Sequence, residues 1–260
     1  MSASPESAQT GRTGATIEVR GVHKEFDGMP VLRGVDLAVP HGCLYGLIGP
    51  GAAGKSVLLK TITGLIAPDA GQVLVEGRDI HAMTELELAE FRLRFGMLFQ
   101  NNALFDYLNV EDNIAFPLRR MTKLSEDEIA RRVADRLKVV SLPDFQKRAP
   151  AGLSGGQKKR IGVARATVID APIVLYDEPA AGLDPVTSQR IFELLRKEQR
   201  AKDATVIMVS SDLDRLLTVT DRVGMLYRGQ LVFDGTTREA QESRDPYVRQ
   251  FVHGLTEGPL

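Results

Sequence analysis

The chain has 260 residues, 43% of them hydrophobic, which suffices for one large domain or two small lobes with their own core. Its 33 Lys and Arg and 34 Asp and Glu leave a formal net charge of −1, which excludes a bulk positive field that would attract nucleic acid or an anionic bilayer. A single cysteine, Cys43, excludes an internal disulfide and favours a reducing compartment, by default the cytosol.

Residues 1–14 are small and polar and lack the apolar segment of a signal peptide, so we expect a disordered tail there. No stretch approaches the ~18 apolar residues that a membrane span requires. If the protein acts at a membrane, another subunit must cross it.

From residue 15 onward, strand-like runs alternate with helical patterns. The third strand leads through a glycine-rich turn into a helix predicted over residues 55–66. This alternation predicts an α/β domain with a mostly parallel sheet covered by helices. The predicted strands are at residues 16–22, 31–39, 43–48, 72–75, 95–99, 173–176, 205–209 and 222–226.

The alternation stops between residues 100 and 170, where the strand signal is absent. Ser125 and Glu128 have the spacing of a capping box at the start of a helix predicted over residues 125–140. We therefore interpret residues 101–170 as a helical subdomain inserted into an α/β core of residues 15–240. Residues 241–260 form a C-terminal tail.

The first chemical motif is G-P-G-A-A-G-K-S, which fits the phosphate-loop pattern G-x-x-x-x-G-K-[ST] and sits between a strand and a helix. Its glycines let backbone N–H groups point at phosphate oxygens, while the following helix presents its positive end. We expect Lys55 to reach the β- and γ-phosphates of ATP and Ser56 to bind Mg²⁺. The predicted loop residues are Gly49, Pro50, Gly51, Ala52, Ala53, Gly54, Lys55, Ser56 and Val57.

A second motif, I-V-L-Y-D-E, ends an apolar strand in two acids. Asp177 could bind Mg²⁺ through water, and Glu178 could activate the attacking water as a general base. Two solvated acids at a strand end would give the same pattern. The phosphate loop earlier in the chain favours the catalytic interpretation.

A third motif, L-S-G-G-Q at residues 153–157, opens a helical run. Ser154 with the N–H groups of Gly155 and Gly156 would make an anion site at a helix N-terminus, although a plain N-cap is the alternative. Placed between a phosphate loop and a D-E strand, this pentapeptide resembles the signature of the ATP-binding cassette (ABC) ATPases. The resemblance extends over roughly residues 15–240.

The resemblance implies a P-loop NTPase core, mostly parallel, with an antiparallel N-terminal β portion and an inserted helical subdomain. It also implies that two copies close head to tail, so that Ser154, Gly155, Gly156 and Gln157 of one copy complete the ATP site of the other.

Further roles follow from the resemblance alone. Phe26 would stack on adenine, with an ordinary core phenylalanine as the alternative. Gln100 would touch Mg²⁺ and the attacking water and relay nucleotide state to a transmembrane permease, although a surface glutamine would fit the same position. Asp184, which ends A-G-L-D, would lie where the two copies meet.

V-S-S-D at residues 209–212 departs from the family. The strand there resembles one that ends in a histidine contacting the γ-phosphate, but this chain has Ser211, and its histidines are His23, His41, His81 and His253. Loss of one preorganised donor lowers turnover by about 10²- to 10³-fold in other enzymes. Three interpretations stay open: a motor with lowered turnover, a slowly hydrolysing ATP-driven clamp, and a neutral substitution whose role a water or Asp212 fills.

Residues 97–119 and 245–260 resemble the ATPase of the Mla-type phospholipid transporters. Those transporters work with Mce-family lipid-binding proteins between the inner and outer membranes of bacteria. The resemblance implies a homodimer on the cytosolic face of the inner membrane, bound to a permease and in some cases a small regulatory subunit, and no nucleic acid. It also places the apolar side chains Phe99, Leu104, Phe105 and Leu108 in the groove that receives the permease, with ordinary core positions as the alternative.

The tail has apolar residues at helical spacing: Tyr247, Val248, Phe251, Val252 and Leu255. This stripe could fold onto its own domain, while the Mla resemblance favours contact with the other cassette and a regulatory partner.

We predict an ATP-hydrolysing subunit of a multi-chain transporter that drives phospholipid movement. Three alternatives stay open: a transporter ATPase for another substrate, an ABC regulator that moves nothing, and a degenerate subunit paired with an active one.

Overall fold

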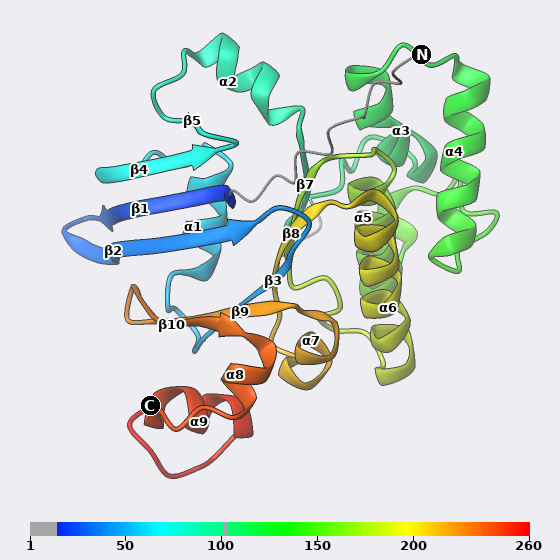
Figure 1. Cartoon of the computed structure of the whole chain (residues 1–260). Coiled ribbons are helices and arrows are strands. Elements are labelled where there is room, and N and C mark those ends of the chain that lie inside the picture. The colour runs from blue at the N-terminus through cyan, green and yellow to red at the C-terminus, as the bar shows by residue number, and fades with distance from the viewer. Residues whose placement is uncertain (1–14, 101–102) are drawn as a thin grey trace, which may run out of the picture.

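The computed structural model describes residues 15–100 and 103–260, so the predicted tail over residues 1–14 lies outside the described residues. The chain forms two sheets and a group of helices (Figure 1). In this view the smaller sheet lies on the left and helices α3 and α4 lie on the right, on opposite sides of the larger sheet. The α/β fold is therefore confirmed.

The smaller sheet is antiparallel and has the strand order β2-β1-β4-β5. It is the antiparallel N-terminal portion that the family resemblance implies. Its strands are β1 (Ala15–Phe26), β2 (Met29–Pro40), β4 (Ala70–Val75) and β5 (Arg78–Asp79).

The larger sheet has the order β10-β9-β3-β8-β7-β6, and all of its neighbours pair in parallel except β10 with β9. β10 was not predicted, because most of its side chains are exposed or half-buried and give no apolar run. The strands are β3 (Leu44–Ile48), β6 (Phe95–Leu98), β7 (Ile173–Asp177), β8 (Thr205–Val209), β9 (Arg222–Tyr227) and β10 (Gln230–Thr236).

Among the described residues between β6 and β7, the regular elements are α-helices and one short 3₁₀ turn, as the loss of strand signal predicted. The predicted capping box is present, because the Ser125 hydroxyl accepts from the Glu128 N–H and the Glu128 carboxylate accepts from the Ser125 N–H. The elements there are α3 (Val110–Met121), α4 (Glu126–Val139), η1 (Pro150–Gly152) and α5 (Gly155–Thr167).

Helix α1 (Lys55–Ile62) is shorter than the predicted helix over residues 55–66. Gly64 has a φ of 70°, a left-handed conformation typical of the residue that ends a helix. The other helices are α2 (Glu85–Arg92), α6 (Pro185–Lys202), α7 (Leu213–Val219), α8 (Thr237–Gln241) and α9 (Pro246–His253). Within the described part of the chain, no helix combines the length and apolarity needed to cross a membrane.

Two hydrophobic cores lie against the larger sheet, and β3 contributes to both. Leu44 and Ile48 belong to the core shared with the helices α3 to α6, whereas Tyr45 and Leu47 belong to the core shared with α1 and the smaller sheet. Alternate side chains of a strand point to opposite faces, so this short strand joins the two halves of the protein.

The apolar stripe of the tail packs onto its own domain. Val248 and Val252 of α9 are buried in the helix-side core, Tyr247 and Phe251 pack against its edge, and Leu255 is exposed. In α9 the apolar stripe thus packs onto its own domain, which is one of the two predicted possibilities. Contact of residues 241–260 with a second copy or a regulatory subunit stays a prediction for their outward side.

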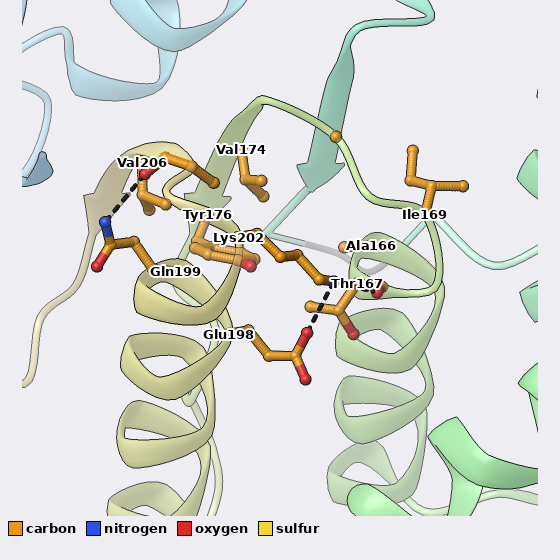
Figure 2. Close-up of a pocket in the computed structure, with 11 residues that line it drawn as sticks. Ala166, Thr167, Ile169, Val174, Tyr176, Glu198, Gln199, Lys202 and Val206 are labelled. Atoms are coloured by element: carbon orange, nitrogen blue, oxygen red, sulfur yellow. Dashed lines mark hydrogen bonds and ion pairs between the residues drawn. The ribbon is translucent and has the colours of Figure 1, made fainter. Parts of the chain in front are cut away.

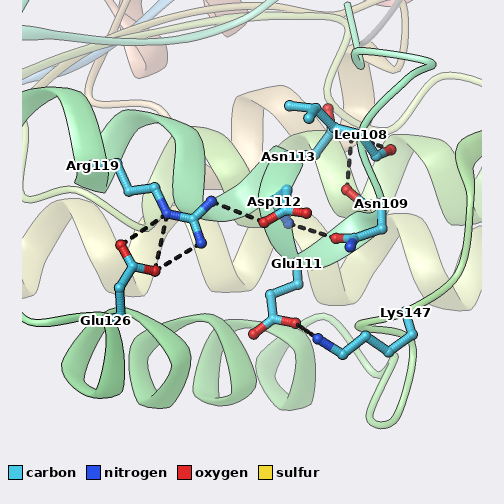
Figure 3. A network of polar contacts seen from close by, with 8 residues as sticks. All are labelled: Leu108, Asn109, Glu111, Asp112, Asn113, Arg119, Glu126 and Lys147. Carbon is cyan, nitrogen blue, oxygen red and sulfur yellow. Dashed lines mark hydrogen bonds and ion pairs between the residues drawn. The ribbon is translucent and has the colours of Figure 1, made fainter.

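A buried amide fixes the segment before α3. Asn113 is fully buried, and its Oδ1 accepts from the Phe105 N–H at 2.8 Å. Its Nδ2 lies within hydrogen-bond distance of the Phe105 carbonyl at 3.0 Å, and of the carbonyls of Leu108 and Asn109 at 3.1 and 3.0 Å (Figure 3). One side chain thus holds residues 105–109 against α3.

A largely exposed set of ion pairs links α3 to α4 and to the loop that follows α4 (Figure 3). The Arg119 guanidinium contacts the carboxylates of Asp112 and Glu126 at 2.8 to 3.1 Å, and these contacts raise the pKa of Arg119. Lys147 pairs with Glu111 at 2.6 Å. Water competes for all of these groups, so we expect their contribution to stability to be small.

The two features predict mutational losses of stability that differ in size. Asn113→Leu would leave buried backbone groups of residues 105–109 without partners and should lower the free energy of unfolding by about 2 to 4 kcal/mol. Arg119→Met also removes four hydrogen bonds but should cost less than about 1 kcal/mol, because its ion pairs are exposed. Urea denaturation of both variants checks this. Equal losses, or a larger loss for Arg119→Met, would contradict our account of the helical region.

Candidate nucleotide-binding site

The predicted site residues follow parallel strands that end at one edge of the larger sheet. Asp177, the last residue of β7, pairs with Val209 of β8, and Val209 pairs with Leu47 of β3. On the other side of β7, Leu98 of β6 pairs with Tyr176. Because the four strands are parallel and in register, the residues after their ends gather at the same edge.

The phosphate loop requires glycine at two positions. Gly49 has a φ of 139°, and a Cβ there would lie 2.0 Å from the Leu226 carbonyl oxygen. Gly54 has a φ of 103°, and a Cβ there would lie 2.9 Å from the Val31 carbonyl oxygen. Both conformations disfavour any other residue. The loop therefore requires glycine at positions 49 and 54, two of the positions that the motif specifies.

The N-terminus of α1 is available for an anion. Gly54 is its N-cap, and among the described residues no side chain caps the helix. The N–H groups of its first turn, which includes Ser56 and Val57, are thus available to a phosphate, and the helix dipole favours negative charge there.

Lys55 is the cation of this loop. Its Nζ donates to the carbonyls of Gly49 at 2.6 Å and Pro50 at 2.7 Å. Burial lowers the pKa of Lys55, while the nearby carboxylates of Glu178 and Asp177 act in the opposite direction. The ammonium therefore lies over the loop, within the electrostatic field of the acid pair.

The acid pair is held by the sheet. Asp177 is buried, and among the described residues no cation forms an ion pair with it. Glu178 has a φ of 56°, a left-handed conformation that is uncommon for this residue, and its N–H donates to the Val209 carbonyl at 2.9 Å. Strained backbone of this kind is often found at functional sites.

Ser211 reaches the predicted general base. Its hydroxyl donates to Oε2 of Glu178 at 3.0 Å. Asp212 is engaged elsewhere, since it is the N-cap of α7 and pairs with Arg215. The arrangement gives no support to the alternative in which Asp212 replaces the missing histidine, and it links Ser211 directly to the acid pair.

Gln100 lies just beyond β6, with its side chain exposed. Its carbonyl accepts a 2.7 Å hydrogen bond from Nζ of Lys159, a buried lysine in α5 that our sequence analysis did not select. Helical spacing could have predicted that Lys159 is buried, because the apolar residues Val163 and Ala166 follow it one and two turns later on the same face of α5. Gln100 is thus connected to the helix that follows L-S-G-G-Q.

The signature motif forms a capping box. The Ser154 hydroxyl accepts from the Gln157 N–H at 3.3 Å, and Gln157 Oε1 accepts from the Ser154 N–H at 2.9 Å. In this structure Ser154 acts as an ordinary helix N-cap, the alternative to an anion site in our sequence analysis. The N–H groups of Gly155 and Gly156 lie in the same turn, and their role toward a second copy stays a prediction.

Two predicted residues are exposed. Asp184 is the N-cap of α6 and accepts from the N–H groups of Val186 and Thr187. Hydrogen bonds from the Thr187 side chain and from these N–H groups lower the pKa of Asp184. Phe26, at the end of β1, is 41% exposed, and Nζ of Lys24 lies 5.3 Å from its ring centroid. An exposed ring excludes the ordinary core position and leaves adenine stacking as a prediction.

A small pocket lies between α5, α6 and the sheet (Figure 2). Its volume is about 10 Å³, room for roughly one water molecule. Lys202 and Glu198 form an ion pair at 2.8 Å beside it, and Gln199 donates to the Ala204 carbonyl. This space is too small for a substrate.

A larger apolar groove of about 310 Å³ lies beside β6 and α3. Of the four apolar residues predicted there, Phe99 and Phe105 line it, whereas Leu104 packs against the helix-side core and Leu108 is half-buried. Its remaining lining residues are Phe95, Gly96, Met97, Ala103, Phe116, Pro117, Met121, Arg165, Ala166 and Ile169.

The chain is similar to known ATP-binding proteins of transporters. Residues 32–181 match the family model described as ABC transporter. The chain is 42% identical over 247 residues to the probable ribonucleotide transport ATP-binding protein mkl of Mycobacterium leprae, covering 95% of this chain and 71% of that protein. It is 35% identical to MlaF of Escherichia coli K12, an intermembrane phospholipid transport system ATP-binding protein, covering 94% of this chain and 91% of MlaF.

A solved dimeric ATP-binding cassette in a post-hydrolysis state, bound to ADP and Pi, is also similar. It superposes with a TM-score of 0.81 at 28% identity, covering 85% of this chain and 99% of that chain. The family model and these relatives show that the chain belongs to the ABC transporter family as an ATP-binding, ATP-hydrolysing subunit.

Proposed function

We propose that this chain hydrolyses ATP on the cytosolic face of a transmembrane permease and thereby drives phospholipid movement between bacterial membranes. The observation that carries the proposal is the apolar groove of Phe99, Phe105 and Phe116 beside Gln100, which supports docking of a permease segment next to the nucleotide. The match to nearly the whole length of MlaF supports a phospholipid as the substrate.

The site residues have defined roles in this proposal. Lys55 and the N–H groups of residues 51–57 bind the phosphates, and Phe26 stacks on the adenine. Mg²⁺ fits the buried carboxylate of Asp177, which has no ion-pair partner among the described residues, together with the oxygens of Ser56 and Gln100. These are hard ligands of the kind that Mg²⁺ prefers. The bound ion would neutralise charge that develops on the phosphates.

Glu178 accepts a proton from water as the water oxygen attacks the γ-phosphorus. The bond from that phosphorus to the β,γ-bridging oxygen breaks, giving ADP and inorganic phosphate. Ser211 holds the Glu178 carboxylate through its hydroxyl and so aims the base. Ser154, Gly155, Gly156 and Gln157 of a second copy close the site near Asp184.

A second candidate substrate is a ribonucleotide, which the name of the mycobacterial relative favours. Reconstitution separates the two. The chain is purified with its transmembrane subunit and placed in liposomes, and ATP-dependent transfer of labelled phospholipid and uptake of labelled ribonucleotide are measured. Glu178→Gln serves as the inactive control. Lipid transfer that needs ATP and Glu178 supports the proposal, and ribonucleotide uptake without lipid transfer overturns it.

The groove gives a prediction about the partner. Phe116 is 41% exposed and lines the groove, so Phe116→Glu should abolish co-purification of the transmembrane subunit by placing a charge on an apolar docking surface. Leu86→Glu is the matched control, because Leu86 is an exposed apolar residue of α2 that does not line the groove. Co-purification that survives Phe116→Glu would contradict permease docking at this surface.

Ser211 gives a prediction about turnover. Ser211→Ala should lower kcat about tenfold with little change in KM, because it removes a hydrogen bond to a charged group. The matched control is Ser210→Ala, since the Ser210 hydroxyl accepts from the Asp212 N–H and does not contact the base. A native kcat for Ser211→Ala would contradict a catalytic role for Ser211 and favour a neutral substitution. A strong rise in kcat for Ser211→His would contradict it too and favour a slow clamp.

A further inference from the structure

Lys159 is a buried cation in an unusual place. It is 4% exposed and lies in α5, the helix that begins with L-S-G-G-Q. Its Nζ donates to the Gln100 carbonyl at 2.7 Å, across 59 residues of sequence. A neutral backbone oxygen is thus the hydrogen-bond partner of this lysine.

A buried ammonium is costly unless its contacts compensate for lost hydration. Among the described residues, no carboxylate forms an ion pair with Lys159. Burial lowers the pKa of Lys159, and the more distant charges of Glu178 and Asp177 oppose that shift. An apolar residue of similar length would fill this position at lower free energy, so stability alone does not explain a lysine here.

The same helix holds the chain at a second point. Nη1 of Arg165 donates to the Ala103 carbonyl at 2.8 Å, and its guanidinium lies 5.9 Å from the Phe105 ring centroid. Lys159 therefore binds the main chain at Gln100, beside the proposed nucleotide site, and Arg165 binds it at Ala103, which lines the apolar groove.

We propose that Lys159 is a positioning residue that ties the main chain of Gln100 to α5, so that Gln100 and the signature motif move together. In a closed dimer each chain binds one nucleotide through Gln100 and presents Ser154 to the other nucleotide. If Gln100 and the signature motif of one chain move together, a change in the nucleotide bound at one site also changes how Ser154 contacts the nucleotide at the other site. This inference rests on the proposed function, and it adds a residue outside the phosphate loop and the acid pair.

The test compares variants of the full-length chain. Lys159→Met fills the same volume without charge or donor, Lys159→Arg keeps both, and Lys158→Met is the matched control at the adjacent, half-buried lysine. We expect Lys159→Met to melt at or above the native temperature and to bind ATP with native affinity, yet to lose about tenfold in kcat, since it lacks a charge-assisted hydrogen bond. Lys159→Arg should recover part of the loss, and Lys158→Met should match the native chain.

Amide hydrogen exchange gives a readout that does not depend on turnover. Without nucleotide, Lys159→Met should speed exchange in peptides spanning residues 97–109 relative to the native chain. With ATP and Mg²⁺, the native chain should show slower exchange at both residues 97–109 and 153–160, whereas Lys159→Met should lose the response at 153–160.

A folded Lys159→Met variant with native exchange in both segments and native kcat overturns the inference. A variant that only melts lower, with both exchange responses intact, assigns Lys159 a purely structural role and also overturns it. Failure of the proposed function is distinguishable, because then the native chain itself shows no permease-dependent ATP hydrolysis.

Discussion

The site depends on the parallel register of β3, β8, β7 and β6. Pairing of Leu47 with Val209, and of Val209 with Asp177, brings the ends of three strands to one edge. The phosphate loop, the acid pair and Ser211 follow these ends directly, so no long-range loop has to be ordered to assemble them. A one-residue slip in any of the strands would turn the following side chains toward the other face of the sheet. Buried side chains on both faces of β3, β7 and β8 prevent such a slip.

The hydrogen bond from Ser211 to Glu178 suggests what the serine does at the position where the family has a histidine. A serine cannot carry charge, and its hydroxyl reaches the base instead. With Asp212 used as a helix cap, the geometry favours a motor whose base is aimed by a neutral donor. Such a site has no imidazole that titrates near neutral pH at this strand end.

The sequence was most informative where backbone geometry restricts residue choice. The glycines at 49 and 54, the capping box at Ser125 and the apolar strands could all be predicted, because each is a local requirement of the backbone or of a buried strand. Strand β10 could not be, since an exposed edge strand has no clear apolar pattern.

Contacts between distant segments were also beyond prediction. Lys159 reaches Gln100 across the helical insertion, and a single sequence contains no signal for that pairing. The tail showed the same limit, because helical spacing identified the apolar stripe of α9 but not the surface that it covers.

The most direct test is an experimental structure of the Glu178→Gln variant with ATP and Mg²⁺. Our account predicts a dimer with the γ-phosphate held by Lys55 and the phosphate loop, the metal ion beside Asp177, and Ser154 of the second copy facing the same nucleotide. It also predicts that the Ser211 hydroxyl stays within hydrogen-bond distance of the side chain at position 178. A nucleotide bound away from this sheet edge, or a Ser211 hydroxyl turned onto the γ-phosphate instead, would contradict it.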